Sequence, residues 1–383
     1  MIYRPLFRLV LTRIRPVQAH ALAVRATQLL VAIPPVRAAM QRWLVPSDPR
    51  LVVHLWGLRF PSPIGSAAGN DKDAAWFREL GLLGFGFVEV GTVTPRPQAP
   101  NPGQTVFRLV HARALINRMG FPNPGAAVVA ARLKKREPNA VVGVNIGKGR
   151  DTAIEDAHQD YETCARELGS LADYVVLNVS SPNTPRLREI QSVSRLSALI
   201  DGVRAQLASS HTPLLIKVSP DVSDDELDQI ADLAVAKAVD GIVAVNTTTT
   251  RDGVARQYAA EAGGLSGAPL GPRALAVLTR LYSRVGDRVP LISVGGIESA
   301  EDVLERMRAG ASLVQGHTGF IYGGPFWPFR LNRQLSRELA AQKVDSIQAL
   351  VGVGASDIGP SVVGHVVVDE RSPASSPRGI ALR

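Results

Sequence analysis

The chain has 383 residues, of which 45% are hydrophobic and 20% charged, and its net charge is +9. This length provides a sizeable core and allows one large domain with appendages. A single cysteine, Cys164, excludes a disulfide framework, and no Cys/His cluster has zinc spacing, so we predict no metal site. Residues 1–50 hold eight arginines and one acid, Asp48, a net charge of +7, whereas the remainder is nearly neutral. Such a local excess favours an anionic surface as partner over nucleic acid.

The first 45 residues form a predicted N-terminal helical element. Prolines divide it into short helices, and they stand at Pro5, Pro16, Pro34 and Pro35. The longest apolar stretch, residues 17–33, is interrupted by His20, Arg25 and Gln28, which makes it a poor membrane span. Two interpretations stay open here. The element is either a basic amphipathic unit that lies in a membrane interface or a helix pair packed on the rest of the protein.

Residues 46–342 have a regular alternation: eight short runs rich in Val, Ile and Leu each precede a segment with a helical pattern. The runs are PIGSAAG, FVEVGT, VVGVNIG, YVVLNVS, LLIKVS, GIVAVNTT, LISVGGI and SLVQGHTG. Continuous apolar strands that alternate with helices are typical of parallel strands buried on both faces, and eight such units indicate a closed barrel. The predicted fold is therefore α/β, an eight-stranded parallel β/α (TIM) barrel with a small N-terminal helical domain.

Each predicted strand ends in polar residues or glycine, and in such barrels the chemistry gathers at these ends. Two lysines and four asparagines converge there: Lys72, Lys217, Asn70, Asn145, Asn178 and Asn246. They suit an anionic substrate that bears amides. Glycines in SVGGI, GHTGF and GGLSGAPL offer bare backbone for a phosphate. Because no catalytic acid pair, Ser-His-Asp order or metal cluster accompanies them, cofactor chemistry is favoured over hydrolysis.

Taken together, these motifs resemble the dihydroorotate dehydrogenases. AAGNDKD, GTVTPRPQ, FRLV, INRMGF, VNIGK, NVSSPNTP, KVSPD, NTT, GGLSGAPL, SVGGI and GASLVQGHTGFIYGGP occur in the family's order and spacing, over residues 1–341. The N-terminal helices resemble those of the membrane-associated, quinone-dependent class. The resemblance implies an FMN-containing barrel that oxidises (S)-dihydroorotate to orotate in pyrimidine biosynthesis and passes the electrons to a membrane quinone. It also implies a peripheral protein on the cytoplasmic side of the cell membrane; the oligomeric state is left open, monomer included.

Residue by residue, the resemblance assigns three groups of contacts. The FMN contacts fall at Ala68, Gly69, Asn70, Asp71, Lys72, Thr92, Asn145, Asn178, Lys217, Val245, Gly267, Gly296, His317 and Thr318. The substrate contacts fall at Lys72, Asn117, Arg118, Met119, Gly120, Phe121, Asn178, Asn183, Asn246 and Thr247. Arg108 and His20 match positions that line the family's quinone tunnel. Lys72 is expected to pair with the orotate carboxylate, and Lys217 to offset negative charge on the reduced flavin.

The catalytic base implied by the resemblance is Ser181. A serine hydroxyl is a weak base near neutral pH, so we predict a relay through Thr184 and a water. The soluble classes use cysteine at this position, whereas Cys164 falls in a predicted helix over 154–168, away from the site. Serine therefore favours the quinone class independently of the N-terminal helices.

Four departures from the family pattern concern the site: Arg186 replaces a glycine of the active-site loop, His317 a usual tyrosine, Pro122 and Pro124 polar residues, and Asn70 an apolar one. Residues 343–383 lie outside the resemblance and are expected to form a flexible extension, with SVVGHVVVDE as a candidate extra strand. Two other functions stay open. One is a related flavin barrel such as a tRNA dihydrouridine synthase, and the other is a catalytically decayed, membrane-bound scaffold.

Overall fold

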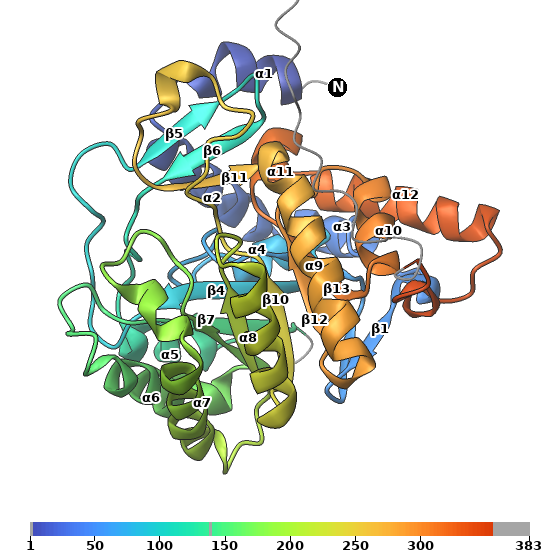
Figure 1. The fold of residues 1–383 in the computed structure, drawn as a ribbon. Coiled ribbons are helices and arrows are strands. Elements are labelled where there is room, and N and C mark those ends of the chain that lie inside the picture. Colours follow the sequence, from blue (N-terminus) through green and yellow to red (C-terminus); the bar gives the residue numbers. More distant parts are fainter. Residues whose placement is uncertain (1–2, 138–139, 355–383) are drawn as a thin grey trace, which may run out of the picture.

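The computed structural model describes residues 3–137 and 140–354, and its centre is a closed barrel of eight strands (Figure 1). The eight strands are β3 (Ile64–Ser66), β4 (Phe87–Val93), β7 (Val142–Ile146), β8 (Tyr174–Asn178), β9 (Leu214–Val218), β10 (Gly241–Ala244), β12 (Leu291–Val294) and β13 (Ala311–Gly316). Neighbours around the barrel are parallel, and β13 closes it by pairing with β3. All eight predicted apolar runs are barrel strands, so the predicted fold class is confirmed.

The barrel forms because its strands are apolar on both faces. β7, β8 and β9 are buried along their whole length, as parallel strands between side chains in the lumen and surrounding helices must be. The helices of the outer layer are α4 (Phe77–Leu82), α5 (Ala126–Leu133), α6 (Ala157–Leu168), α7 (Val193–Leu207), α8 (Asp224–Ala236), α9 (Gly271–Val285), α10 (Ala300–Arg308), α11 (Thr318–Gly323) and α12 (Trp327–Ala341). Cys164 lies in α6, within the helix predicted over 154–168, and is buried.

Short 3-10 turns connect several of these elements: η2 (Pro49–Leu51), η3 (Gly169–Leu171), η4 (Leu187–Gln191), η5 (Arg256–Tyr258), η6 (Ala268–Leu270) and η7 (Gly286–Arg288). Helix starts are set by local chemistry. α10 begins at a reciprocal capping box, in which the Ser299 side chain accepts from the Asp302 N–H and the Asp302 carboxylate accepts from the Ser299 N–H. This cap fixes where α10 begins, directly after the loop that follows β12.

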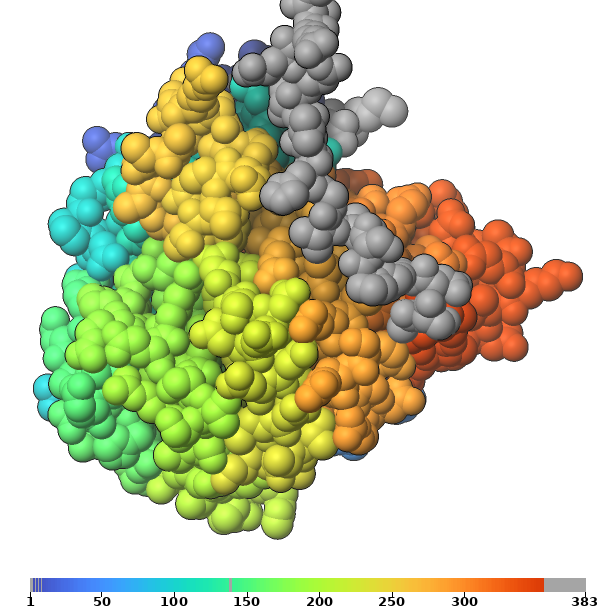
Figure 2. Space-filling view, in the orientation of Figure 1, coloured from blue at the N-terminus to red at the C-terminus, as the bar shows by residue number. Residues whose placement is uncertain are grey.

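Five strands lie outside the barrel and were not predicted. β1 (Val53–Leu55) and β2 (Leu58–Phe60) form a hairpin, while β5 (Val106–Leu109), β6 (Ala114–Asn117) and β11 (Gly264–Gly267) form an antiparallel sheet. The GGLSGAPL motif supplies β11, which the chain reaches only after β10. The small sheet and α1 lie together at one end of the barrel. Figure 2 shows the yellow segment around β11 on the surface of the molecule at this end.

The N-terminal element consists of α1 (Tyr3–Leu9), η1 (Leu11–Arg13), α2 (Pro16–Val31) and α3 (Pro34–Trp43). Pro16 and Pro34 begin helices, as predicted, since a first-turn N–H has no intrahelical acceptor to lose. Pro5 does not end a helix; it lies in the first turn of α1 for the same reason. No single helix among residues 3–137 and 140–354 is long and apolar enough to cross a membrane. Taken together, α2 and α3 have the length and composition of a membrane span, but their axes are bent by 101°.

Residues 343–354 differ from the expected flexible extension. They contain η8 (Ile347–Leu350), where Ile347 is fully buried, and the Gln348 side chain exchanges two hydrogen bonds with the backbone of His54. Ile347 and Leu350 belong to the main hydrophobic core, so the packed part of the chain extends past residue 342. The candidate strand SVVGHVVVDE and the rest of the expected extension lie outside the described residues.

Candidate active site

A cavity of ≈830 Å³ occupies the carboxyl ends of the barrel strands and extends between them and the N-terminal helices. Most of the predicted site residues line it: Ala68, Gly69, Asn70, Lys72, Thr92, Asn117, Met119, Gly120, Phe121, Asn178, Ser181, Asn183, Lys217, Val245, Asn246, Thr247, Gly267, Gly296, His317 and Thr318. His20 and Arg108 line it as well. Four do not: Asp71, Arg118, Asn145 and Thr184. The fold thus gathers residues from the ends of seven barrel strands around one space, and β7 contributes only from behind the wall, through Asn145.

A chain of amide hydrogen bonds holds the floor of the cavity. Asn178 donates from Nδ2 to Thr92 Oγ1 at 2.8 Å and to Asn145 Oδ1 at 3.1 Å. Asn246 Nδ2 in turn donates to Asn178 Oδ1 at 3.1 Å and to Ser180 Oγ at 3.0 Å. Because each amide is fixed by the next, the site presents donors and acceptors in set directions before any ligand arrives. Asn145 therefore acts behind the wall, through Asn178 and Thr92.

Glu89 is a buried acid beneath this network that the sequence reasoning missed. It is fully buried in β4, accepts from Asn145 Nδ2 at 2.8 Å and Gln315 Nε2 at 2.7 Å, and lies 3.7 Å from Lys217 Nζ. Buried charges occur almost only with partners, and here Lys217 and Glu89 neutralise each other. The signal was present in FVEVGT, where an acid interrupts an otherwise apolar buried strand.

Ser181 lies in the loop after β8 and is 4% exposed, with its Oγ accepting from the Asn183 N–H at 3.2 Å. Asn183 also donates from Nδ2 to Asn117 Oδ1 at 3.2 Å, which ties this loop to β6. The Thr184 hydroxyl is buried and has no hydrogen-bond partner within the described ranges. An unsatisfied buried hydroxyl three residues after the serine in the same loop is a position at which a water could be held.

Arg188 holds the same loop from its far side. It donates to the Ser180 carbonyl at 3.2 Å and the Thr247 carbonyl at 3.3 Å, and it pairs with Asp221 at 2.9 Å. Burial alone would raise the pKa of Asp221, but hydrogen bonds from Thr248 and Thr249 and the charge of Arg188 hold that pKa below its usual range. One guanidinium therefore joins the loop after β8 to the loops after β9 and β10.

Arg186 has a backbone conformation that glycine adopts more readily than other residues. Its φ is 56°, in the left-handed region, and its side chain pairs with Glu189 at 2.8 Å. A non-glycine residue in this region costs about 1 kcal/mol. The turn at Arg186 is therefore locally strained.

Glycines form the wall after β12 and β11. A Cβ on Gly296, whose φ is +77°, would lie 2.3 Å from Gly271 Cα, and a Cβ on Gly267, at φ +101°, would lie 2.3 Å from the Arg113 carbonyl. Neither position accepts a side chain, and both line the cavity. The Gly296 N–H has no acceptor among the described residues. This wall is bare backbone with a free donor, the arrangement that suits a phosphate.

Two imidazoles and a lysine lie where the cavity turns toward the N-terminal helices. Burial lowers the pKa of His317 to about 3, helped by the charges of Lys72, His20 and Lys217. The His20 ring is exposed to the cavity and packs edge-on against Trp76 at 5.4 Å between centroids, and desolvation together with the charge of Lys72 lowers its pKa to about 4. Burial lowers the Lys72 pKa too, and its Nζ donates to the Gly69 carbonyl. Both histidines are therefore neutral near pH 7.

Arg108 marks the other end of the cavity. It donates at 2.8 Å to the carbonyls of Leu11 and Ile14 and lies 6.0 Å from the centre of the Phe7 ring. Burial lowers its pKa, with Tyr322 and Tyr3 opposing this. Arg108 thus anchors η1 to β5 as well as bordering the cavity.

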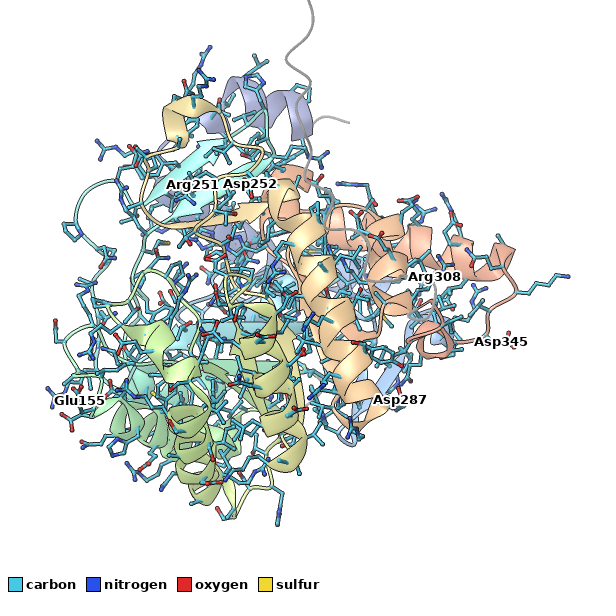
Figure 3. All side chains as sticks on the ribbon, in the orientation of Figure 1. Glu155, Arg251, Asp252, Asp287, Arg308 and Asp345 are labelled. Atoms are coloured by element: carbon cyan, nitrogen blue, oxygen red, sulfur yellow. The ribbon has the colours of Figure 1, made fainter. Side chains whose placement is uncertain are left out.

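Asp71 and Arg118 have structural partners instead. The Asp71 carboxylate is 3% exposed and accepts from the Ala75 and Trp76 N–H groups, while Arg118 pairs with Glu261 at 2.9 Å and stacks on Phe107. Both side chains shape the loops of the site from outside the cavity. Figure 3 shows how densely side chains fill the barrel beneath this end.

Comparisons with known proteins agree with this geometry. The dihydroorotate dehydrogenase family model matches residues 50–339. A dihydroorotate dehydrogenase (quinone) of Mycobacterium tuberculosis is 49% identical over 350 residues, 91% of this chain and 97% of its own. A protein of Thermobifida fusca with the same name is 48% identical over 372 residues, which are 94% of this chain and 98% of that protein. The DHODH of Eimeria tenella solved with ferulenol superposes with a TM-score of 0.79 at 34% identity, covering 88% of this chain and 95% of that one.

Proposed function

The chain belongs to the dihydroorotate dehydrogenase family, and we propose on that premise that it is a quinone-dependent member. It oxidises (S)-dihydroorotate to orotate in pyrimidine biosynthesis, with FMN as hydride acceptor and a membrane quinone as final electron acceptor. The observation that carries the proposal is the single cavity, which has Ser181 and Lys217 at its barrel end and α1, α2 and α3 around its other end. One space thus serves both a buried polar substrate and an apolar one.

The residues present fit FMN. The glycine wall and the free Gly296 N–H suit its phosphate, and the amides around Asn178 suit the polar edge of its ring system. When bound, FMN supplies the hydride acceptor for dihydroorotate and the electron donor for the quinone. Lys217, paired with Glu89, lies at the floor of the site, where its ammonium group would face the negative charge of the reduced flavin ring.

The chain's own residues perform the remaining tasks. Lys72 pairs with the carboxylate of dihydroorotate, and Asn117, Asn183 and Asn246 hold the ring through hydrogen bonds. Ser181 removes the ring proton and passes it on through a water held at Thr184. Because Ser181 is nearly fully buried, this relay is the route by which the proton leaves a site closed to bulk solvent.

The N-terminal element is proposed to admit the quinone and to rest on the cytoplasmic face of the cell membrane. Large apolar side chains are exposed along this element: Leu29 on α2, Ile33 between the two helices and Trp43 on α3. Arg25, Arg37 and Arg42 are exposed on the same helices. Apolar side chains flanked by arginines fit an anionic lipid interface better than a purely internal packing role. The oligomeric state is left open.

The other two functions considered from sequence are not favoured. The family match and the orotate-type amide site separate the chain from the tRNA-modifying flavin barrels. A catalytically decayed scaffold has no use for a buried Glu89–Lys217 ion pair or for the hydrogen-bonded amides around Asn178.

The test is an absorption spectrum of the purified protein before and after dihydroorotate is added without oxygen, followed by a lipophilic quinone. We expect flavin bands that bleach with dihydroorotate and return with quinone. A colourless protein, or a flavin that dihydroorotate does not reduce, would refute the proposal.

A further inference from the structure

Arg306 is a buried arginine on α10 that no role in the site yet explains. It is 3% exposed, and among the described residues no carboxylate lies within ion-pair distance of it. Its Nη2 donates to the Gly271 carbonyl at 2.7 Å and to the Gly295 carbonyl at 3.2 Å. Its Nε and Nη1 have no partner in the part of the chain that the structure describes. A buried guanidinium with unused donors requires an explanation.

The hydrogen bond to Gly295 fixes the direction of a peptide group in the cavity wall. The Gly295–Gly296 bond is trans, so its C=O and N–H point in opposite directions. Because the Gly295 carbonyl points back to Arg306, the Gly296 N–H points forward, into the cavity that both glycines line. Arg306 itself does not reach the cavity. It therefore acts through this peptide.

Arg306 also places a positive charge behind the same wall. Burial lowers its pKa to about 10, with Glu305 and Asp302 opposing this, so the group stays protonated near neutral pH. The Asp302 carboxylate is engaged by the N–H groups of Glu298 and Ser299. An uncompensated buried cation attracts an anion strongly because little water screens it.

We infer that Arg306 is a positioning residue for the phosphate of the cofactor. It turns the Gly296 N–H toward the phosphate through the Gly295 carbonyl and supplies a positive charge behind the glycine wall. The inference rests on the proposed function, because it takes FMN as the cofactor. It predicts that Arg306 contributes to binding of the phosphate and not to binding of the flavin ring.

The experiment compares FMN with riboflavin, which lacks the phosphate. Dissociation constants of both are measured by flavin fluorescence for the full chain and for three variants, Arg306→Met, Arg306→Lys and Arg308→Met. Arg308 is the matched control, since it lies on the same helix, bonds to Gln342 at the surface and is labelled in Figure 3. Thermal unfolding of each variant is recorded in parallel.

We expect Arg306→Met to weaken FMN binding about tenfold to a hundredfold, because a buried positive charge behind the glycine wall is lost, and to leave riboflavin binding unchanged. Arg308→Met should change neither constant. Equal losses for both flavins would mean a general structural role and would overturn the inference, as would no loss for FMN. If Arg306→Met does not fold, Arg306→Lys decides, with a smaller loss for FMN alone expected. If the unaltered protein bound FMN no more tightly than riboflavin, the assignment of FMN as the cofactor would be refuted instead.

Discussion

At the scale of single residues, the site depends on groups whose neighbours are fixed. Ser181 has its Oγ held by the Asn183 N–H, and the buried Thr184 hydroxyl has no partner among the described residues. Lys217 faces Glu89 in the barrel interior. A weak base such as serine is useful only if its position and its proton route are set in advance.

Replacing Ser181 with alanine should slow anaerobic flavin reduction by dihydroorotate about 10²–10⁴-fold, because a positioned acid–base group is lost. Flavin content and orotate binding should stay near the parent values, since Asn178 and Lys72 are untouched. Stopped-flow absorption measures the rate, and a spectral titration with orotate serves as the control. A variant that reduced its flavin at the parent rate would show that Ser181 is not the base.

His317 should make the protein sensitive to acid. Its pKa in the folded protein is about 3, below its value near 6.5 in the unfolded chain, so between these values the unfolded chain binds more protons. Stability is therefore complete above pH 6.5 and falls as the pH drops toward 3. Between pH 7 and pH 5, the unfolding free energy of His317→Gln should therefore fall by about 1 kcal/mol less than that of the parent protein. This difference is smaller than the pKa shift alone would give, because the imidazole borders the cavity.

Urea unfolding at the two pH values measures this difference. His111→Gln is the matched control, because His111 is exposed on the loop between β5 and β6. Equal acid sensitivity of the parent and His317→Gln would contradict the prediction.

At the scale of elements, the loops after β8, β9 and β10 act as one unit because Arg188 and Asp221 join them. Neither residue lines the cavity. Their effect on catalysis must therefore pass through the position of Ser181 and Thr247. The strained Arg186, which keeps the glycine-like turn of the same loop, is consistent with a loop whose course is determined by its contacts at both ends.

Asp221→Asn removes the charge that pairs with Arg188 and should raise the KM for dihydroorotate about tenfold, since a hydrogen bond to a charged group contributes about 1.5 kcal/mol. FMN content and quinone reoxidation should not change, because the loop does not touch the glycine wall. Asp224→Asn, which disturbs an exposed ion pair on α8, is the control. An unchanged KM in Asp221→Asn would refute the role of this pair.

At the scale of the whole molecule, the barrel and the N-terminal element share one cavity but serve different half-reactions. Nothing in proton or hydride removal from dihydroorotate requires α1, α2 or α3. The structure also shows that Arg108 anchors the Leu11 and Ile14 carbonyls, so its replacement by alanine would loosen this element as well as alter the cavity.

Deleting residues 1–44 should spare flavin reduction by dihydroorotate, while reoxidation by a lipophilic quinone falls sharply. Binding to anionic liposomes should weaken and lose its dependence on salt, because the exposed arginines and apolar side chains of α2 and α3 are removed. Stopped-flow traces of each half-reaction and liposome sedimentation measure these effects, with thermal unfolding as the check that the barrel folds. Unchanged quinone reoxidation would leave the helices as packing elements.

The sequence by itself determined the barrel, because each strand is a local apolar run with a helix after it, and a period of that kind is visible without knowledge of the fold. It also located the polar strand ends, since their positions follow from where each run stops. Local pattern was less informative for β5, β6 and β11, because four barrel strands separate β6 from β11 along the chain.

Only the tertiary structure decided which groups pair. Gln315 reaches Glu89 across 226 residues, and Arg306 meets the carbonyls of two glycine loops that belong to different strand–helix units. In the sequence, each of these residues is an isolated polar side chain on an apolar strand or helix face. Closure of the barrel gives them their partners, because it brings the ends of distant strands within hydrogen-bond distance in a space where an unpaired charge is unfavourable.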